Sequence, residues 1–125
     1  MTSSPQPTPP QHAGEDESNA WRRRAARVEP AAQRTYTPSL AVIARSEGSF
    51  HWTPEGRKLA DFTSGVLVAN LGHNPVDWWR RVHGYLGIDK LPSGGEFFSA
   101  ATLTAYNALT PLEIQASERL VTSLR

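Results

Sequence analysis

Residues 48–65 have the sequence GSFHWTPEGRKLADFTSG, and NLGHNP follows at residues 70–75. Phe50 and Trp52 alternate with polar residues, which is typical of a half-buried strand. Proline suits the second position of a β-turn and glycine tolerates a positive φ, so TPEG at residues 53–56 predicts a chain reversal. This part of the chain is therefore expected to form a tight hairpin that leads into a loop containing glycine.

Two further strands are expected beside the central one, from the apolar run Leu40–Ala44 and from residues 57–62. Three short antiparallel strands form a meander, which needs a cover for its apolar face. We expect the next helix to provide it, because Asn74 is a suitable cap and Pro75 suits the first helical position. The apolar stripe of that helix consists of Val76, Trp79, Val82 and Leu86.

A second helix is predicted near the C-terminal end of the sequence. Thr110 and Glu113 have the spacing of a capping box, with Pro111 at the first helical position. Its expected apolar stripe is Leu112, Ala116, Leu120 and Leu124. The stripe continues up to Arg125 without a terminator, so we expect the sequence to be a piece of a longer protein.

Composition limits the kinds of site that are possible. The chain has 125 residues, a formal net charge of +1 and no cysteine, which excludes disulfides and thiolate metal ligands. Residues 1–19 lack apolar periodicity and are predicted to be a disordered tail. No secretory signal or long apolar run is present, so we expect a cytoplasmic protein that does not enter a membrane.

Residues 20–35 are predicted to form a basic helix and a linker. A helix capped near Asn19 would place Arg22, Arg23, Arg24 and Arg27 beside Trp21. One interpretation is a contact with nucleic acid or a membrane surface, and the other is a solvated helix that pairs with the acidic triplet at residues 15–17 or with a missing portion of the protein. The second is preferred, because so short a basic stripe supplies few phosphate contacts. The alternative function of the whole chain is a small interaction module that uses this helix and exposed tryptophans.

Residues able to carry chemistry are present, but their spacing favours no catalytic or metal site. Ser64 is flanked by glycine on one side only, unlike the nucleophile of a serine hydrolase. His12, His51, His73 and His83 show no helical pair at metal-binding spacing, so no metal site is expected. Gly65 and Gly72 either let backbone amides approach an anion or simply allow tight turns.

The motif as a whole resembles the N-terminal part of the class III aminotransferases, which use pyridoxal phosphate. The matching residues are Trp52, Gly56, Arg57, Leu59, Asp61, Phe62, Ser64, Gly65, Gly72, His73 and Pro75. Thr53 departs from the usual aspartate, Ala60 from a larger residue, and the spacing at Asn74-Pro75 is one residue tighter. The similarity covers roughly residues 36–125, which we interpret as a truncated aminotransferase domain.

The resemblance implies an α+β / α/β fold, namely the small-domain portion of a fold type I pyridoxal phosphate enzyme that forms homodimers. Its substrates would be an amino donor and a keto acid. By the same resemblance, Ser64 and Gly65 belong to the substrate site, and the two residues that follow them, Val66 and Leu67, line the substrate entrance. Tyr106 is the matching position for a pocket aromatic, although it could equally be an ordinary core residue.

No catalytic residue is expected within this chain. Transamination requires a Schiff-base lysine, and only Lys58 and Lys90 are available. Lys58 lies beside an exposed turn and Lys90 precedes a loop, so neither has surroundings that lower the pKa of an amine. In the resembling family the Schiff-base lysine and most of the phosphate site lie far downstream. The cofactor-binding residues are therefore left unassigned, and the chain alone is predicted to be inactive.

Overall fold

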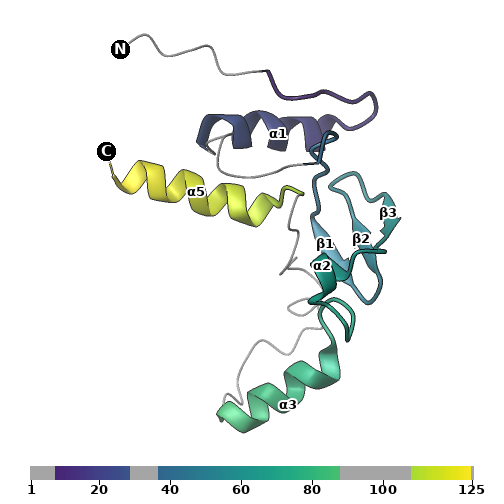
Figure 1. The fold of residues 1–125 in the computed structure, drawn as a ribbon. Helices are drawn as coiled ribbons and strands as arrows, with labels where there is room; N and C mark the ends of the chain where they lie inside the picture. The colour runs from purple at the N-terminus through teal and green to yellow at the C-terminus, as the bar shows by residue number, and fades with distance from the viewer. Residues whose placement is uncertain (1–7, 29–36, 88–107, 125) are drawn as a thin grey trace.

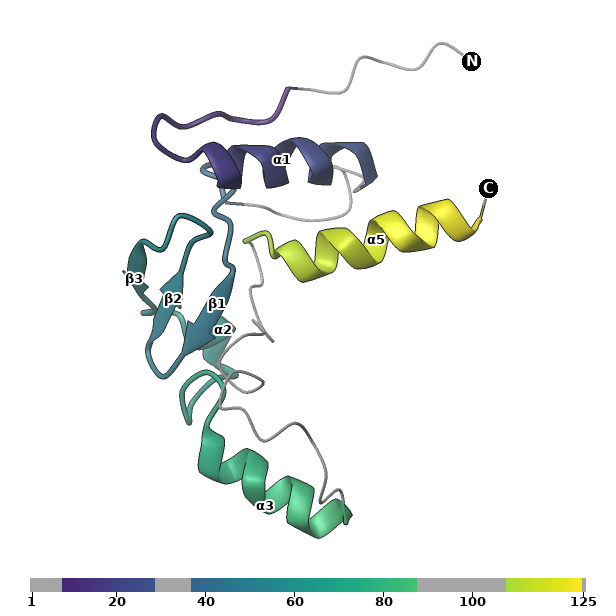
Figure 2. The ribbon, with the colours of Figure 1, turned by 180° about the vertical axis from the view of Figure 1, so that it is seen from behind.

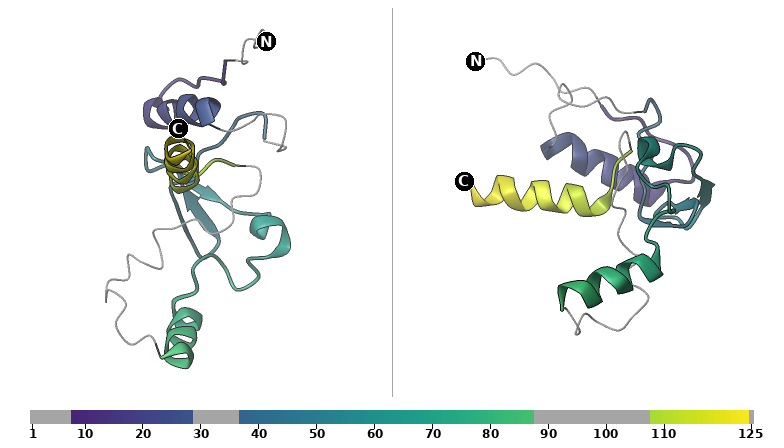
Figure 3. Two further views of the ribbon diagram at one scale, coloured as in Figure 1. Left: turned by 90° about the vertical axis from the view of Figure 1, so that its left-hand side faces the viewer. Right: turned by 60° about the horizontal axis from the view of Figure 1, so that its bottom comes forward.

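A computed structural model describes residues 8–28, 37–87 and 108–124 of the chain. The described part is α+β, as expected, with one three-stranded antiparallel sheet and helices. Helices α1 (Asp16–Val28) and α5 (Pro111–Ser123) lie side by side at one end, and α3 (Val76–Leu86) projects at the other (Figures 1 and 2). The sheet and the short helix α2 (Ser64–Leu67) lie between these two ends (Figure 3).

The predicted three-stranded antiparallel meander is confirmed, but its first strand is Arg45–Glu47 and not the apolar run Leu40–Ala44. Strands β1 (Arg45–Glu47), β2 (Phe50–Trp52) and β3 (Lys58–Ala60) pair in that order. The predicted turn joins β2 to β3, and Gly56 N donates to Thr53 O at 2.9 Å with φ of 81° at Gly56. Both the strand order and the turn follow from local sequence chemistry.

The apolar run Leu40–Ala44 pairs with a distant segment instead of forming the first strand. Val42 makes a parallel bridge with Leu109, because Ile43 N donates to Leu109 O and Leu109 N donates to Ala41 O, both at 2.8 Å. This pairing brings the segment that precedes α5 against the segment that precedes the sheet. The run therefore joins the two parts of the fold.

The described hydrophobic core lies between α1, the apolar run and α5. Its buried members are Ala25, Val42, Leu109 and Ile114, with Trp21, Val28 and Leu40 packed against them. Burial of a valine, leucine or isoleucine side chain stabilises a fold by about 1.5–3 kcal/mol, so Val42, Leu109 and Ile114 supply most of this term. The core therefore holds the helical end of the molecule together, while the sheet is positioned by its connections.

Helix α1 begins at Asp16, so the prediction of a cap at Asn19 is wrong. Residues 16–19, assigned from the sequence to the tail, form its first turn. The amide of Asn19 instead exchanges two hydrogen bonds with the backbone of His12. The carboxylate of Glu55, in the β2–β3 turn, accepts from Ser18 N and Ser18 Oγ, both at 2.7 Å. A residue 37 positions away therefore satisfies an N-terminal amide of α1.

Helix α5 begins as predicted but packs through a different face. Thr110 Oγ1 accepts from Glu113 N at 3.2 Å, with Pro111 next to the cap. The fully buried residue is Ile114, whereas Leu112, Leu120 and Leu124 of the predicted stripe are more than half exposed. The prediction of the packing face is wrong: α5 packs through Ile114, which joins Ala25 and Val42 in the core, and Glu118 pairs with Arg24 of α1.

Helix α3 does not cover the sheet, contrary to expectation. It projects away from the meander, none of its residues is buried, and Leu86 is 59% exposed (Figure 1). Pro75 is its cap residue, while Asn74 has φ of 51° and donates from Nδ2 to Ser46 O at 2.8 Å. The predicted cap fails because the Asn74 side chain is used in this tertiary contact.

Candidate functional site

The loop after β3 is fixed by one carboxylate. Asp61 Oδ1 accepts from Thr63 N at 2.7 Å, Thr63 Oγ1 at 2.8 Å and Ser64 N at 3.1 Å. Aspartate favours turns of this kind because its short side chain reaches the backbone two or three residues ahead. Asp61 thereby sets the direction in which the chain enters α2.

Helix α2 is an unusual left-handed turn. Ser64, Gly65, Val66 and Leu67 have φ of 49°, 58°, 63° and 67°. The turn is closed by bonds from Leu67 N to Thr63 O at 3.0 Å and from Val68 N to Ser64 O at 2.9 Å. The left-handed conformation costs about 1–2 kcal/mol for each L-residue, and it is rarest for a β-branched residue such as Val66. The predicted site residues therefore form a strained segment, and strained backbone is concentrated at functional sites.

The strained turn presents apolar side chains outward. Ser64 and Gly65 are partly buried, whereas Val66 is 48% and Leu67 is 86% exposed. The following segment, residues 68–75, lines an open cavity of about 310 Å³ together with Trp78 and Trp79. This volume is at the lower end for a small-molecule site. Residues 64–67 precede this lining in the chain and are not part of it, so their assignment to a substrate site stays a prediction.

The fifth predicted site residue and one of the two lysines lie outside the described residues. These are Tyr106 and Lys90. Lys58 is in β3, where its ammonium group lies 3.7 Å from the ring centre of Phe50 and 5.5 Å from that of Trp52. It is exposed and does not line the cavity. The described part of the chain therefore has no lysine placed to bind an aldehyde cofactor in this hollow.

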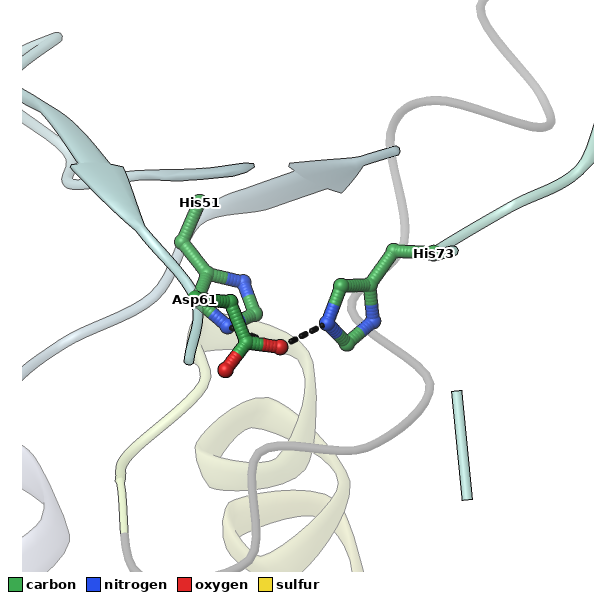
Figure 4. A group of neighbouring side chains, drawn as sticks. All are labelled: His51, Asp61 and His73. Carbon is green, nitrogen blue, oxygen red and sulfur yellow. Dashed lines mark hydrogen bonds and ion pairs between the residues drawn. The ribbon is translucent and has the colours of Figure 1, made fainter. Parts of the chain in front are cut away.

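A cluster that the sequence analysis missed lies beneath the loop. His51 on β2, Asp61 after β3 and His73 before α3 converge on one point (Figure 4). His73 Nε2 donates to Asp61 Oδ2 at 2.7 Å, and His51 Nε2 lies 3.6 Å from the same oxygen. The exposed fractions of the side chains are 14% for His51 and 4% for each of the other two. Their spacing along the chain is not helical, because strand pairing and an isolated bridge bring them together.

Backbone pairing holds the third member in place. Gly48 N donates to His73 O at 2.9 Å and His73 N donates to Gly48 O at 2.8 Å. A Cβ atom on Gly72 would lie 3.1 Å from Gly48 Cα, so the two glycines allow this close approach. The alternation of the hairpin also offered a signal, because His51 pairs with Leu59 and Asp61 follows two residues later on the same side.

The electrostatics of the cluster keep its carboxyl group ionised. Burial tends to raise the pKa of Asp61, but hydrogen bonds from His73 and Thr63 outweigh it, so that pKa lies well below its ordinary value. Burial lowers the pKa of His51, His73 adds to the decrease, and Asp61 opposes it. The cluster therefore favours a carboxylate beside a neutral His51 imidazole.

The basic helix is used inside the molecule, which weakens the interaction-module alternative. Arg22 is 2% exposed and pairs with Glu15 at 2.6 Å. Arg24 makes two bonds to Glu118 on α5, at 2.8 and 2.5 Å, and lies over the ring of Trp21. The pairing of Arg22 with Glu15 agrees with the preferred interpretation, but the burial of Arg22 and the pairing of Arg24 with Glu118 were not predicted.

Comparison with known proteins finds similarity to aminotransferases over part of the chain. Acetylornithine aminotransferase of Oceanobacillus iheyensis is 31% identical over 66% of this chain and 22% of its own length. A probable mitochondrial acetylornithine aminotransferase of Schizosaccharomyces pombe is 59% identical over 30% of this chain and 9% of its own length. Succinylornithine transaminase of Yersinia pseudotuberculosis is 41% identical over 31% of this chain and 9% of its own length.

The chain thus spans less than a quarter of the length of these curated relatives. No protein-family model and no solved structure matches the chain. Among the described residues, no helix is both long and apolar enough to cross a bilayer.

Proposed function

We propose that this chain is the N-terminal portion of a class III aminotransferase, an enzyme that transfers an amino group from an amine or amino acid to a keto acid. The observation that carries the proposal is the left-handed turn of residues 64–67. It coincides with the residues that the family resemblance assigns to the substrate entrance. A strained, exposed segment beside an open hollow is what a substrate-contacting loop requires.

In this proposal Val66 and Leu67 provide an apolar wall, and the backbone of Ser64 and Gly65 sets its position. Tyr106 is kept as a further substrate residue on the resemblance alone. The names of the relatives suggest acylated ornithines as the first amino donors to test. Such donors combine a long aliphatic chain with an amine, and an apolar wall would favour the aliphatic part.

Pyridoxal phosphate is the cofactor that the proposal implies, and it would supply the electron sink for amino transfer. The described residues do not fit it, because Lys58 is exposed and engaged with aromatic rings away from the hollow. We therefore propose that the cofactor is held by parts of the enzyme outside this chain, and that the chain by itself is inactive. A cytoplasmic homodimer is part of the same proposal and rests on the resemblance.

The proposal is tested with the complete reading frame that contains this chain. Its product should transfer amino groups from acetylornithine or succinylornithine to a keto acid in the presence of pyridoxal phosphate. Leu67→Ser should raise KM for the donor by about tenfold, since a lost apolar contact of this size is worth about 1–3 kcal/mol. Leu112→Ser is the matched control, because Leu112 is similarly exposed but lies on α5.

Two results would contradict the proposal. One is the absence of any transamination by the complete product across a panel of amino donors and keto acids. The other concerns the 125-residue chain alone, treated with pyridoxal phosphate and borohydride. Specific labelling of Lys58 or Lys90 in that experiment would contradict the inactivity of the isolated chain.

A further inference from the structure

Three side chains of metal-binding type meet at one largely buried point, beside the segment of residues 62–72. The ligand atoms of His51, Asp61 and His73 all lie within 4.8 Å of one another (Figure 4). Each comes from a different segment: β2, the end of β3, and the segment before α3. Burial of two imidazoles against a carboxylate is costly unless each polar atom has a partner. The close approach of three such groups in a buried place therefore requires a physical reason.

The outer contacts of the cluster orient its ligand atoms inward. Asp61 Oδ1 is occupied by donors from Thr63 and Ser64, which leaves Oδ2 directed at both histidines. Ser46, which is fully buried, lies 2.7 Å from His51 Nδ1 through its hydroxyl oxygen. When Nδ1 carries the proton and donates to Ser46, the lone pair of His51 Nε2 faces the cluster. Metal-binding histidines are oriented in this way by a partner at the second ring nitrogen.

We propose that His51 Nε2, His73 Nε2 and Asp61 Oδ2 bind a divalent ion of the zinc class. Zinc takes imidazole nitrogen and carboxylate oxygen at about 2.0–2.2 Å, which places ligands about 3.4 Å apart in a tetrahedron. The observed separations from Asp61 Oδ2, 2.7 Å to His73 and 3.6 Å to His51, lie on either side of that value. Sub-ångström opening of the first pair accommodates the ion, with a water as the fourth ligand.

Metal binding requires neutral imidazoles and an ionised carboxylate, and the three residues can adopt these protonation states. Neutral His73 exchanges its Nε2–H tautomer for the Nδ1–H tautomer, so that the Nε2 lone pair binds the ion in place of the hydrogen bond to Asp61. His51 already favours its neutral form, because burial and the neighbouring His73 lower its pKa. The carboxylate of Asp61 is ionised and offsets one charge of the ion.

The site would act as a clamp on the strained loop. Asp61 and His73 stand at the two ends of the segment that contains the left-handed turn. Fixing both ends to His51 on β2 would restrict the opening of that segment. This inference stands on the cluster alone and does not depend on the proposed transamination.

The test uses the purified 125-residue chain, with zinc and cobalt chlorides as probes. Competition with a chromophoric chelator should give one zinc per chain, and cobalt should give the visible spectrum of a four- or five-coordinate nitrogen–oxygen site. His51→Gln should weaken zinc binding by at least 100-fold. His83→Gln, which removes a histidine from α3, should leave the affinity unchanged.

A second variant tests the site without removing a ligand, in case His51→Gln fails to fold. Ser46→Ala retains all three ligands and should weaken binding by about 10-fold, the lower end of the effect of removing an orienting partner. Circular dichroism of each variant reports whether it is folded. Absence of one-to-one binding by the unaltered chain at millimolar zinc would overturn the proposal. Equal affinity of the unaltered chain and the folded His51→Gln variant would also overturn it, as would loss of binding in His83→Gln.

Discussion

Replacement of Arg22 by leucine should remove much of the stability of the described fold. Its guanidinium is buried and makes three kinds of contact. Nε donates to Leu40 O at 2.9 Å, Nη1 to Asn19 Oδ1 at 2.6 Å, and Nη2 to Glu15 Oε2 at 2.6 Å. Leucine keeps part of the apolar stem but removes the donor of all three hydrogen bonds. Removing one partner of a buried ion pair costs about 3–5 kcal/mol.

The lower half of that range is expected because Glu15 keeps a second partner. Arg57 Nη2 donates to Glu15 Oε1 at 2.9 Å, and the Glu15 side chain is 16% exposed. Asn19 Oδ1 also keeps the bond that it accepts from His12 N at 3.0 Å, whereas Leu40 O loses the bond from Arg22 Nε, and an unsatisfied buried acceptor costs about 1–3 kcal/mol. We therefore expect a loss of about 3–4 kcal/mol, against a total of about 5–15 kcal/mol for a typical domain.

The assay is urea unfolding of the 125-residue chain, followed by far-UV circular dichroism at neutral pH. Arg23→Leu is the matched control, since Arg23 is exposed on the same helix and donates one bond to Gln11. Its effect should stay within about 0.5 kcal/mol. The Glu15 pKa is lowered mainly by its bond from Arg22, so it should rise in Arg22→Leu. Equal losses of stability in the two variants would refute the assignment of Arg22 as a buried support.

Three further outcomes follow from the described structure. Gly72→Ala should lower the free energy of unfolding by about 1–3 kcal/mol more than Gly56→Ala, as measured by thermal unfolding. Both glycines have φ near 80°, but only a Cβ at residue 72 would meet the Gly48 backbone. Equal costs would argue against that contact. Burial raises the pKa of Glu55, but the hydrogen bonds from Ser18 on α1 outweigh it and help to lower that pKa to about 2. The stability that Glu55 contributes is therefore complete above the ordinary pKa of glutamate and is lost as the pH falls toward 2. Glu55→Gln should flatten the acid unfolding curve, and an unchanged curve would be inconsistent with this. Val66→Gly should raise the melting temperature, because relief of the left-handed backbone strain at residue 66, about 1–2 kcal/mol, exceeds the entropic cost of glycine. A lower melting temperature would contradict the strain.

Local chemistry was sufficient for several features. The turn at residues 53–56 follows from proline and glycine, and the start of α5 follows from Thr110, Pro111 and Glu113. The positions of the expected substrate residues came from the family resemblance, which is itself a property of the sequence. The left-handed conformation of Val66 could not be predicted, because a valine gives no local signal for a positive φ.

Tertiary structure decided which distant groups meet. The N-terminal turn of α1 is completed by Glu55 from the hairpin, and the arginine expected on a solvated face is buried against Glu15 and Leu40. His51 and His73 come together only because the backbone of His73 pairs with Gly48 beside the hairpin. Hydrogen bonds within a turn depend on neighbouring residues and can be predicted from them. Contacts between remote segments depend on how the chain closes, which composition and spacing alone do not specify.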